Sequence, residues 1–254
     1  MHVSLLVALL GVTPIKSNQG ANSLCAPEDD PDDCLALVAL WNATGRTFKW
    51  KMDGKTSLCA WFDGSTASEI GCRKSTGRVI NVLIQEENMT GTIPSEIGYL
   101  GELQDWFVTG TDTLSGTLPS ELGQLSNLGG SDSGTDYRRG FTLQSSKISG
   151  TIPPEIGKLG KLHNLVLAYH RLSGTIPPDM FPTSSVNNLR GLGLRGNQLS
   201  GTIPEKICPI VKVGWLCNMC LLGGPDDPAQ YNNFQCPEPS CFATPDYCCY
   251  SSCH

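Results

Sequence analysis

The chain has 254 residues, a length that allows one or two domains. Its composition is ordinary for a globular protein except for 28 glycines, 17 prolines and 12 cysteines. The formal net charge of −6 argues against a general nucleic-acid binder, because such proteins need clustered lysines and arginines to displace the counterions of phosphates. The same charge argues against docking on anionic membrane surfaces.

The N-terminus carries an apolar run from Val3 to Val12, followed by small and polar residues. The run is about as long as the apolar part of a signal peptide and too short to span a membrane, although no Lys or Arg precedes it. We predict a signal peptide over residues 1–20; the alternative is a disordered or buried apolar N-terminus. The polar C-terminus, Cys248–His254, carries no lipid-anchor signal, so we expect a secreted, soluble mature protein.

A helix is predicted over residues 33–45. Asp32 or Asp33 can cap its start, because an aspartate side chain accepts hydrogen bonds from the free N–H groups of a first helical turn. The apolar side chains of the segment share one face, and Gly45 ends it. A helix of this kind suits the cap that a repeat array needs at its exposed end.

An internal repeat dominates the middle of the chain. The tetrapeptide Gly-Thr-Ile/Leu-Pro occurs five times, with its glycine at Gly91, Gly116, Gly150, Gly174 and Gly201. An apolar residue stands two positions ahead of each glycine. A period of roughly 24 residues is that of a solenoid coil, which cannot bury its apolar face alone. Stacked coils therefore share one continuous core.

Each coil also contains a pair of apolar residues separated by one position. The pairs are Val82/Ile84, Trp106/Val108, Phe141/Leu143, Leu165/Leu167 and Leu192/Leu194. Alternation with period two over so short a span predicts a strand with one buried face. One strand and one turn-rich return per coil is the geometry of a solenoid.

These residues resemble the plant-type leucine-rich repeat, LxxLxLxxNxLSGxIPxxIGxL. The best copy runs from Leu189 to Pro204, and the resemblance extends from Arg78 to about Ile207. It implies an α/β solenoid, a right-handed superhelix with a parallel β-sheet on its concave face and disulfide-stabilised caps. The implied divisions are an N-terminal cap with a helix over 21–78, five repeats over 79–207 and a Cys-rich C-terminal cap over 208–254. The layout is also similar to that of secreted repeat proteins of diatom-like microalgae.

The segment before the repeats is similar to the N-terminal cap of that family. Its helix is followed by a W…C-x-W…C…GRV pattern that ends at Gly77-Arg78-Val79. In the family's cap the two later cysteines pair with each other. The resemblance therefore implies a Cys59–Cys72 disulfide and leaves Cys25 to pair with Cys34.

Several coils depart from the family pattern. The turn position that is usually Asn, whose side chain satisfies backbone groups, holds Asn197 in one coil. Three other coils have Glu87, Ser146 and His170 there. One residue is inserted near Thr111-Asp112, and about ten are inserted over Gly129–Arg138. The glycine, serine and aspartate content of the longer insertion predicts a flexible loop that projects from the stack.

Eight cysteines follow the repeats: Cys208, Cys217, Cys220, Cys236, Cys241, Cys248, Cys249 and Cys253. Cys217 and Cys220 have the spacing of zinc ligands, whereas an even number of cysteines after a signal peptide indicates a disulfide framework. We favour disulfides and predict that all twelve cysteines are paired. Two N-glycosylation triplets, beginning at Asn42 and Asn88, fit the same secretory route.

No catalytic constellation is recognisable in the sequence. His163 and His170 lie within one coil, and we interpret His170 as a polar turn residue bonded to the backbone. The metalloprotease, P-loop, nucleophile-elbow and dinucleotide-binding motifs do not occur. We therefore predict a protein that is not an enzyme and that uses no cofactor and no metal.

Residues between the buried strand positions point outward and line up from coil to coil. The candidate partner-binding residues on this concave face are Gln85, Glu86, Phe107, Thr109, Thr142, Gln144, Val166, Tyr169 and Arg195. Phe107 and Tyr169 are the predicted anchors, because aromatic side chains dominate interface hot spots. The alternative is that these residues are neutral, half-solvated surface.

The function predicted from the sequence is a secreted, non-catalytic recognition module. Its partner would be an extracellular protein, peptide or glycan, with no nucleic acid and no direct membrane insertion. The family resemblance implies three forms of such a module: a soluble receptor-like ectodomain, an inhibitor of secreted hydrolases or a matrix component.

A different surface supports a second hypothesis, the binding of ice or another crystal surface. One threonine per tetrapeptide would stack into a row: Thr92, Thr117, Thr151, Thr175 and Thr202. Threonine is also a common choice at this position of the repeat, so the row by itself does not decide the function. An enzyme is the third hypothesis, with no constellation to support it.

Overall fold

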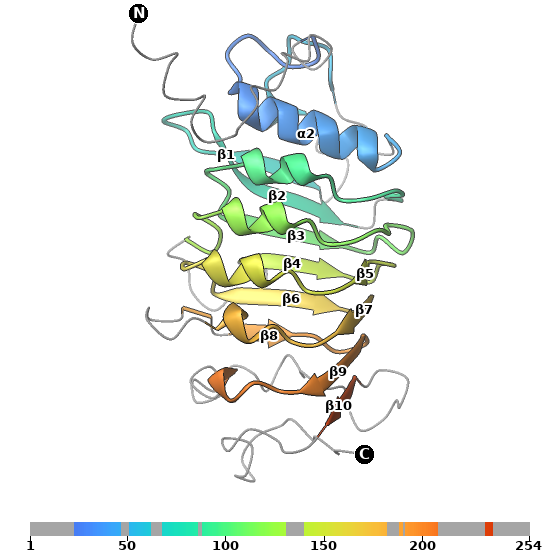
Figure 1. Cartoon of the computed structure of the whole chain (residues 1–254). Helices are drawn as coiled ribbons and strands as arrows, with labels where there is room; N and C mark the ends of the chain where they lie inside the picture. Colours follow the sequence, from blue (N-terminus) through green and yellow to red (C-terminus); the bar gives the residue numbers. More distant parts are fainter. Residues whose placement is uncertain are drawn as a thin grey trace, which may run out of the picture.

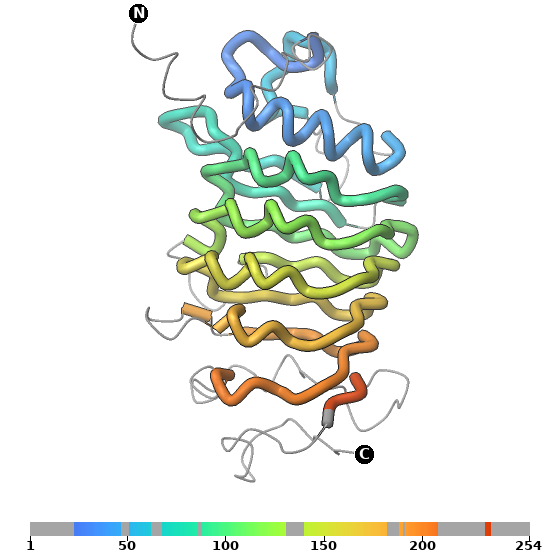
Figure 2. Tube along the Cα trace, in the orientation of Figure 1, coloured from blue at the N-terminus to red at the C-terminus, as the bar shows by residue number. Residues whose placement is uncertain are grey.

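The computed structural model describes residues 23–46, 51–61, 68–85, 88–130, 140–181, 188–189, 191–207 and 232–235. Over these residues the chain forms coils that stack in one row, from a capping helix to a last short strand (Figure 1). A tube along the chain shows the same row of successive turns (Figure 2). The predicted solenoid is therefore confirmed. The predicted signal peptide, Glu86, most of the inserted loop and the eight C-terminal cysteines lie outside the described residues.

The N-terminal cap is built on helix α2, Pro31–Ala43. Its first N–H groups are capped by Asp30, whose side chain accepts hydrogen bonds from the backbone N–H groups of Asp32 and Asp33 at 3.0 and 3.2 Å. The expectation that Asp32 or Asp33 caps the helix is therefore wrong. Pro31, with its fixed φ and no N–H to satisfy, suits the first helical position and moves the cap to the residue before it.

Asp33 instead joins the cap to the first coil. Its side chain is fully buried, and its two oxygens accept hydrogen bonds from Arg78 Nε and Nη2, both at 2.9 Å. The backbone N–H of Val79 donates to the same carboxylate at 2.8 Å. The hydrogen bonds to Asp33 raise the pKa of Arg78. A buried carboxylate needs such a full set of donors, so this pair fixes the position of α2 on the first coil.

Two disulfides staple the same cap. Cys25 is joined to Cys34, and Cys59 to Cys72, with Cα–Cα distances of 6.1 and 5.6 Å. These are the pairs that the family resemblance implied. Cys59 lies in the 3-10 helix η2, Leu58–Ala60, and Cys72 ends strand β1, Glu69–Cys72. The second disulfide therefore ties the cap to the first sheet.

Six strands form one sheet, which we call the main sheet, in the order β1-β2-β3-β4-β6-β8. β1 is antiparallel to β2, and every later pair is parallel. The repeat strands are β2 (Val79–Gln85), β3 (Asp105–Thr109), β4 (Phe141–Gln144), β6 (Asn164–Ala168) and β8 (Gly191–Gly193). These confirm the five predicted strands, with one unpredicted strand at the capped end.

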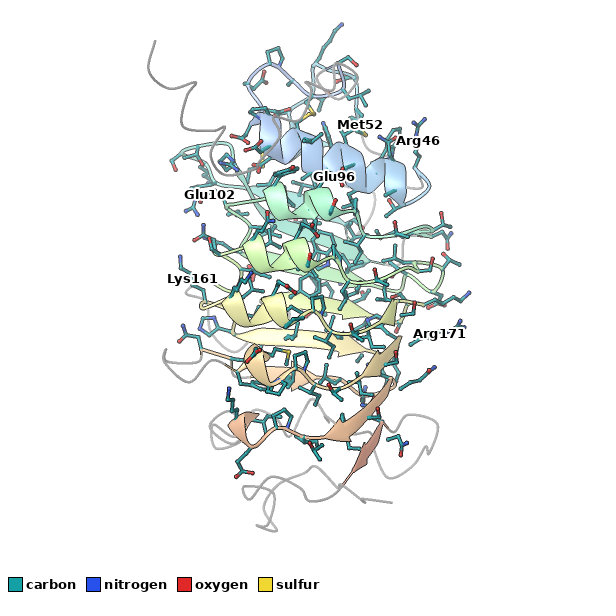
Figure 3. The ribbon with its side chains drawn as sticks, viewed as in Figure 1. Arg46, Met52, Glu96, Glu102, Lys161 and Arg171 are labelled. Carbon is teal, nitrogen blue, oxygen red and sulfur yellow. A yellow bond between two sulfur atoms is a disulfide. The ribbon has the colours of Figure 1, made fainter. Side chains whose placement is uncertain are left out.

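The main sheet forms one side of each coil, and a row of short 3-10 helices forms the opposite side. Side chains fill the space between them and make up the core (Figure 3). The apolar pairs that predicted the strands face inward and are at most 2 % exposed. Trp106 and Phe141 are neighbours in register, and their rings stack with centroids 5.9 Å apart. The 3-10 helices are η3 (Ser95–Tyr99), η4 (Ser120–Gln124), η5 (Pro154–Lys158), η6 (Pro178–Met180) and η7 (Glu205–Ile207).

A second sheet, which we call the lateral sheet, runs along one side of the stack (Figure 1). Its strands are β5 (Ser149–Gly150), β7 (Arg171–Gly174), β9 (Gln198–Thr202) and β10 (Asn233–Gln235), all parallel to their neighbours. Isolated parallel bridges, Thr92–Ser115 and Thr117–Ser149, carry the same register into the earlier coils. Strands β5, β7 and β9 contain the glycine of the repeated tetrapeptide, and its threonine ends β9 or directly follows β5 and β7.

The repeat pattern continues one coil beyond the predicted five copies. The Asn232 side chain accepts a hydrogen bond from the Leu199 backbone N–H and donates to the Leu194 carbonyl, both at 2.9 Å. Asn197 makes the matching bonds one coil earlier. Strand β10 follows Asn232 and pairs with β9. The spacing of Asn232 and Phe234 repeats the Asn-x-Leu spacing at Asn197, so the signal was present within the segment assigned to the C-terminal cap.

Candidate binding site

The middle of the main sheet is not the free surface that was predicted. Phe107, Thr142 and Val166 hold outward strand positions in register, yet they are only 6, 0 and 2 % exposed. Neighbouring strands lie about 4.8 Å apart, so the side chains of one column cover one another, and a threonine between a phenylalanine and a valine is enclosed. The expectation that these three residues form an accessible surface is therefore wrong, and Phe107 is not an exposed anchor.

The accessible part of the predicted face lies at the carboxyl ends of the strands. The residues there are half-buried, and we call them the edge band: Gln85, Thr109, Gln144, Ser145, Tyr169 and Arg195. Gln85 is opposite Thr109 in register, so neutral polar groups follow one another from coil to coil. Serine, threonine and glutamine side chains both donate and accept hydrogen bonds, which suits a polar ligand lying across the coils.

The turn at the end of each strand decides where the edge band points. Ser145 and Tyr169 have positive φ angles of 56° and 62°, and Gly110 and Gly196 have 68° and 70° at the matching places in neighbouring coils. A left-handed conformation costs a residue with a side chain roughly 1–2 kcal/mol. The Tyr169 backbone N–H donates to the Arg195 carbonyl at 2.8 Å, and the Arg195 guanidinium lies 4.7 Å from the centre of the Tyr169 ring.

Gly196 makes room for that ring. A side-chain carbon at position 196 would lie 2.7 Å from Cδ1 of Tyr169, which is closer than two carbon atoms can approach. The left-handed backbone at Tyr169 and the glycine at position 196 of the next coil therefore both keep the aromatic ring at the surface.

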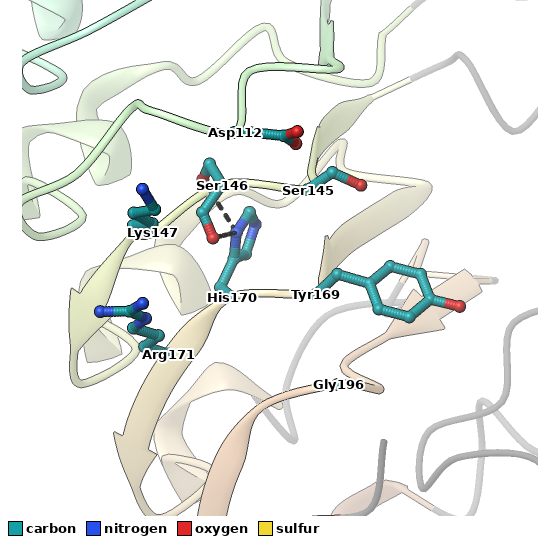
Figure 4. Close-up of a pocket in the computed structure, with 8 residues that line it drawn as sticks. All are labelled: Asp112, Ser145, Ser146, Lys147, Tyr169, His170, Arg171 and Gly196. Atoms are coloured by element: carbon teal, nitrogen blue, oxygen red, sulfur yellow. Dashed lines mark hydrogen bonds between the residues drawn. The ribbon is translucent and has the colours of Figure 1, made fainter. Parts of the chain in front are cut away.

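Beside the edge band lies an open hollow of about 530 Å³ (Figure 4). It is lined by Asp112, Ser145, Ser146, Lys147, Tyr169, His170, Arg171 and Gly196. Lys147 and Arg171 lie on one side of the hollow, and Ser145 and Tyr169 on the other, with the Ser146–His170 pair between them (Figure 4). We call this hollow the pocket.

None of the charged residues of the pocket is among the partner-binding residues predicted from the sequence. Lys147, Arg171 and Asp112 are all exposed, and none of them forms an ion pair with any residue that the structure describes. Asp112 is the inserted residue of its coil, because Thr111 takes the buried turn position. Lys147 and Arg171 directly follow the turn residues Ser146 and His170. This constant position, one residue after the turn, is the feature of the sequence that could have located the two cations.

Comparison with known proteins agrees with this architecture. A family model described as Leucine Rich Repeat matches residues 188–210. A chain in the crystal structure of PEPR1-AtPEP1 is similar over 82 % of this chain, with 25 % sequence identity and a TM-score of 0.61. A chain of the BIR3–SERK2 complex from Arabidopsis thaliana is similar over 82 %, with 26 % identity and a TM-score of 0.56. The chain therefore has the fold of a leucine-rich-repeat solenoid, similar to that of plant leucine-rich-repeat ectodomains.

These similar structures differ in length. The leucine-rich-repeat protein spans 26 % of the matched chain in the PEPR1-AtPEP1 structure and 96 % of the matched BIR3–SERK2 chain. The BIR2 ectodomain from Arabidopsis thaliana, 23 % identical with a TM-score of 0.57, shares the fold over 81 % of this chain. No curated protein matches the sequence.

In two coils of the leucine-rich-repeat protein, Ser146 and His170 occupy the turn position usual for asparagine. His170 Nε2 lies 2.9 Å from the Leu143 carbonyl, and Nδ1 lies 2.9 Å from Ser146 Oγ. A carbonyl only accepts, so Nε2 donates and Nδ1 accepts from the serine hydroxyl of a neutral ring. Burial lowers the pKa of His170, against the smaller opposing effect of its backbone hydrogen bonds. The interpretation of His170 as a backbone-bonded turn residue is confirmed.

The threonine row runs along the lateral sheet, and none of its members lines the pocket. All five threonines are exposed: Thr92, Thr117, Thr151, Thr175 and Thr202. Four of them place Cγ2 against the glycine of the next coil, where an added side-chain carbon would lie 2.6 to 3.0 Å away. The serines beside them donate to glycine carbonyls of the preceding coil, as Ser115 does to Gly91 at 3.0 Å.

The remaining predicted sites are distributed over the molecule. Asn42 and Asn88, which begin the glycosylation triplets, are both exposed. The zinc alternative at Cys217 and Cys220 falls outside the described residues. Within the described ranges, no helix is both long and apolar enough to cross a membrane.

Proposed function

We propose that this leucine-rich-repeat protein is a secreted, non-catalytic recognition module that binds an extracellular protein, peptide or glycan at the edge band and pocket. The turn at Tyr169 carries the proposal. An aromatic residue is held in a costly left-handed conformation, half-exposed and against an arginine. Backbone strain of this kind clusters at ligand-binding sites, and tyrosine and arginine are the residues that dominate interface hot spots.

Two further observations support the proposal. Two of the similar structures are of PEPR1 with AtPEP1 and of BIR3 with SERK2. The two disulfides of the cap suit an oxidising compartment outside the cytosol. An inhibitor of secreted hydrolases is one form that such a module would take, since it also acts by binding a protein surface.

The experiment is a comparison of Tyr169 variants in binding to extracellular proteins and to arrayed glycans. Tyr169→Ala should weaken partner binding by more than about 1 kcal/mol, as hot-spot truncations do. Tyr169→Phe is the matched control, because it keeps the ring beside Arg195 and should retain most of the binding. Equal partner binding by wild type and Tyr169→Ala would contradict the proposal.

A second candidate function is the binding of ice or another crystal surface by the threonine row. The observation that favours it is the row's regularity, because the exposed hydroxyls follow one another from coil to coil and four methyl groups are held against glycines. Thermal hysteresis of the purified protein tests this candidate. Activity that disappears in Thr151→Lys would support it, and a wild-type protein without hysteresis would reject it.

A further inference from the structure

The pocket is lined by two cations, Lys147 and Arg171, and by one carboxylate, Asp112. Lys147 and Arg171 stand on neighbouring coils, because the Arg171 backbone N–H donates to the Ile148 carbonyl at 2.8 Å. Arg171 projects outward from the lateral edge of the stack (Figure 3). The Asp112 carboxylate points toward the side of the pocket that holds Ser145 and Tyr169 (Figure 4). A hollow whose lining holds charges of both signs is complementary to a ligand that carries both signs.

We infer that the pocket binds a carboxylate of a polypeptide ligand through Lys147 and Arg171, while Asp112 receives a cationic or N–H group of the same segment. The inference rests on the proposed function and names the chemistry that the pocket recognises. The guanidinium of Arg171 presents parallel N–H donors that match the two oxygens of a carboxylate. The ammonium of Lys147 adds a second charge from the neighbouring coil.

The two cations are available for a ligand. Neither forms an ion pair with a described residue, whereas Arg73 and Arg78 are both paired. Arg195 lies over the Tyr169 ring and belongs to the anchor rather than to the charged side of the pocket.

Asp112 distinguishes a polypeptide from an acidic glycan. A polyanionic glycan carries one sign of charge along its length and would bring like charges together at Asp112, which is costly at an interface. A polypeptide segment offers a carboxylate beside lysine, arginine or backbone N–H groups. The neutral donors and acceptors of the edge band also suit an extended backbone, which presents both kinds of group.

The test is an array of short peptides in matched sets, printed beside heparin and polygalacturonate and probed with the purified protein. Each set contains three peptides. The first has a Lys and a Glu near each other, the second has Gln in place of that Glu, and the third has Gln in place of that Lys. The variants are Lys147→Gln/Arg171→Gln and Asp112→Asn. The matched control is Lys158→Gln/Lys206→Gln, which removes the same charge from exposed residues in η5 and η7.

We expect binding to the Lys-and-Glu peptides to fall roughly tenfold or more when Glu is replaced by Gln, because hydrogen bonds to a charged group are lost. The Lys147→Gln/Arg171→Gln protein should show the same loss, and the Lys158→Gln/Lys206→Gln protein should not. Asp112→Asn should reduce the preference for a neighbouring Lys while leaving the preference for Glu. Binding should also weaken at high ionic strength, because the contact is exposed.

Three results would overturn the inference. The first is peptide binding that does not change when Glu is replaced by Gln, and the second is an array to which no peptide binds. The third is binding to heparin or polygalacturonate that requires Lys147 and Arg171 and becomes stronger in Asp112→Asn. The last would assign the pocket to an acidic glycan. If partner binding needs Tyr169 but not Lys147 and Arg171, the inference fails while the proposed function stands. If no partner depends on Tyr169, the proposed function itself fails.

Discussion

The two sheets of this solenoid run side by side through the same coils but differ in how their outward residues vary. On the lateral sheet every coil repeats a Ser or Thr, a Gly and a Thr. On the main sheet one outward column reads Leu83, Phe107, Thr142, Val166 and Gly193. One face is therefore chemically uniform and the other irregular, although both are built by the same repeat.

The uniformity of the lateral sheet has a packing explanation. Ser149 Oγ donates to the Gly116 carbonyl of the preceding coil at 3.1 Å, and Thr117 places its methyl against Gly150 of the next coil. Each residue type thus packs against the coil beside it, whatever the face binds. No such repeated contact accounts for Tyr169, Lys147 or Arg171. The comparison teaches that in a repeat protein the departures from the repeat carry more information about function than the repeated residues.

The largest expected effect concerns the outward column of the main sheet. Phe107→Ala should lower the free energy of unfolding by about 3 kcal/mol, because the ring is buried and its loss leaves a cavity. Leu167→Ala, on the inward side, should cost about 2–5 kcal/mol and serves as the reference. Urea unfolding measures both. A Phe107→Ala cost below about 1 kcal/mol would mean that this column is a free surface after all.

The next effect concerns the lateral sheet. Gly150 has a φ of +81°, and a side-chain carbon there would lie 2.9 Å from Thr117 Cγ2. Gly150→Ala should therefore cost roughly 1–2 kcal/mol of stability, mainly from the left-handed backbone. Gly160→Ala is the control, since nothing lies within 4 Å of an added carbon and its φ is not positive. Equal stability of the two variants would show that glycine is not required in the repeated turn.

A third effect appears only in acid, at the turn between the two sheets. Burial lowers the pKa of His170, so the unfolded chain takes up its proton first, near its ordinary pKa of about 6.5. The unfolded state then binds more protons, and the free energy of unfolding falls as the pH drops below that value. His170→Asn, which copies Asn197, should lose less stability between about pH 7.5 and pH 5 in urea unfolding. An identical loss in both proteins would contradict this explanation.

The sequence was sufficient for the features that depend on local pattern. The apolar pairs located every repeat strand, and the family resemblance implied both cap disulfides that the structure describes. The predicted cap of α2 lies two or three residues after the observed one, Asp30, because Pro31 takes the first helical position. The buried carboxylate of Asp33 was missed because its partner, Arg78, lies 45 positions away in the sequence.

The candidate site was only partly predictable, because exposure depends on neighbouring coils. Alternation along a strand predicts that Phe107 and Val166 point outward, but it does not tell how much the adjacent strands cover them. Arg195 follows the same alternation, whereas Tyr169 lies just after the end of its strand; both are half-buried rather than enclosed. Lys147 and Arg171 lie beyond the strands of the main sheet, and only the stacking of their coils brings them to one side of a pocket.

The smallest expected effect separates the two faces most directly. Thr117→Ala and Thr175→Ala remove exposed side chains, so each should change the free energy of unfolding by less than about 0.5 kcal/mol. Both should also leave partner binding intact, because these threonines do not line the pocket, whereas Tyr169→Ala should weaken it. Parallel binding and urea-unfolding measurements on the three variants give the comparison. If the threonine variants lose activity and Tyr169→Ala retains it, the uniform face is the functional one, because a regular surface would then have been selected for what it binds as well as for how its coils pack.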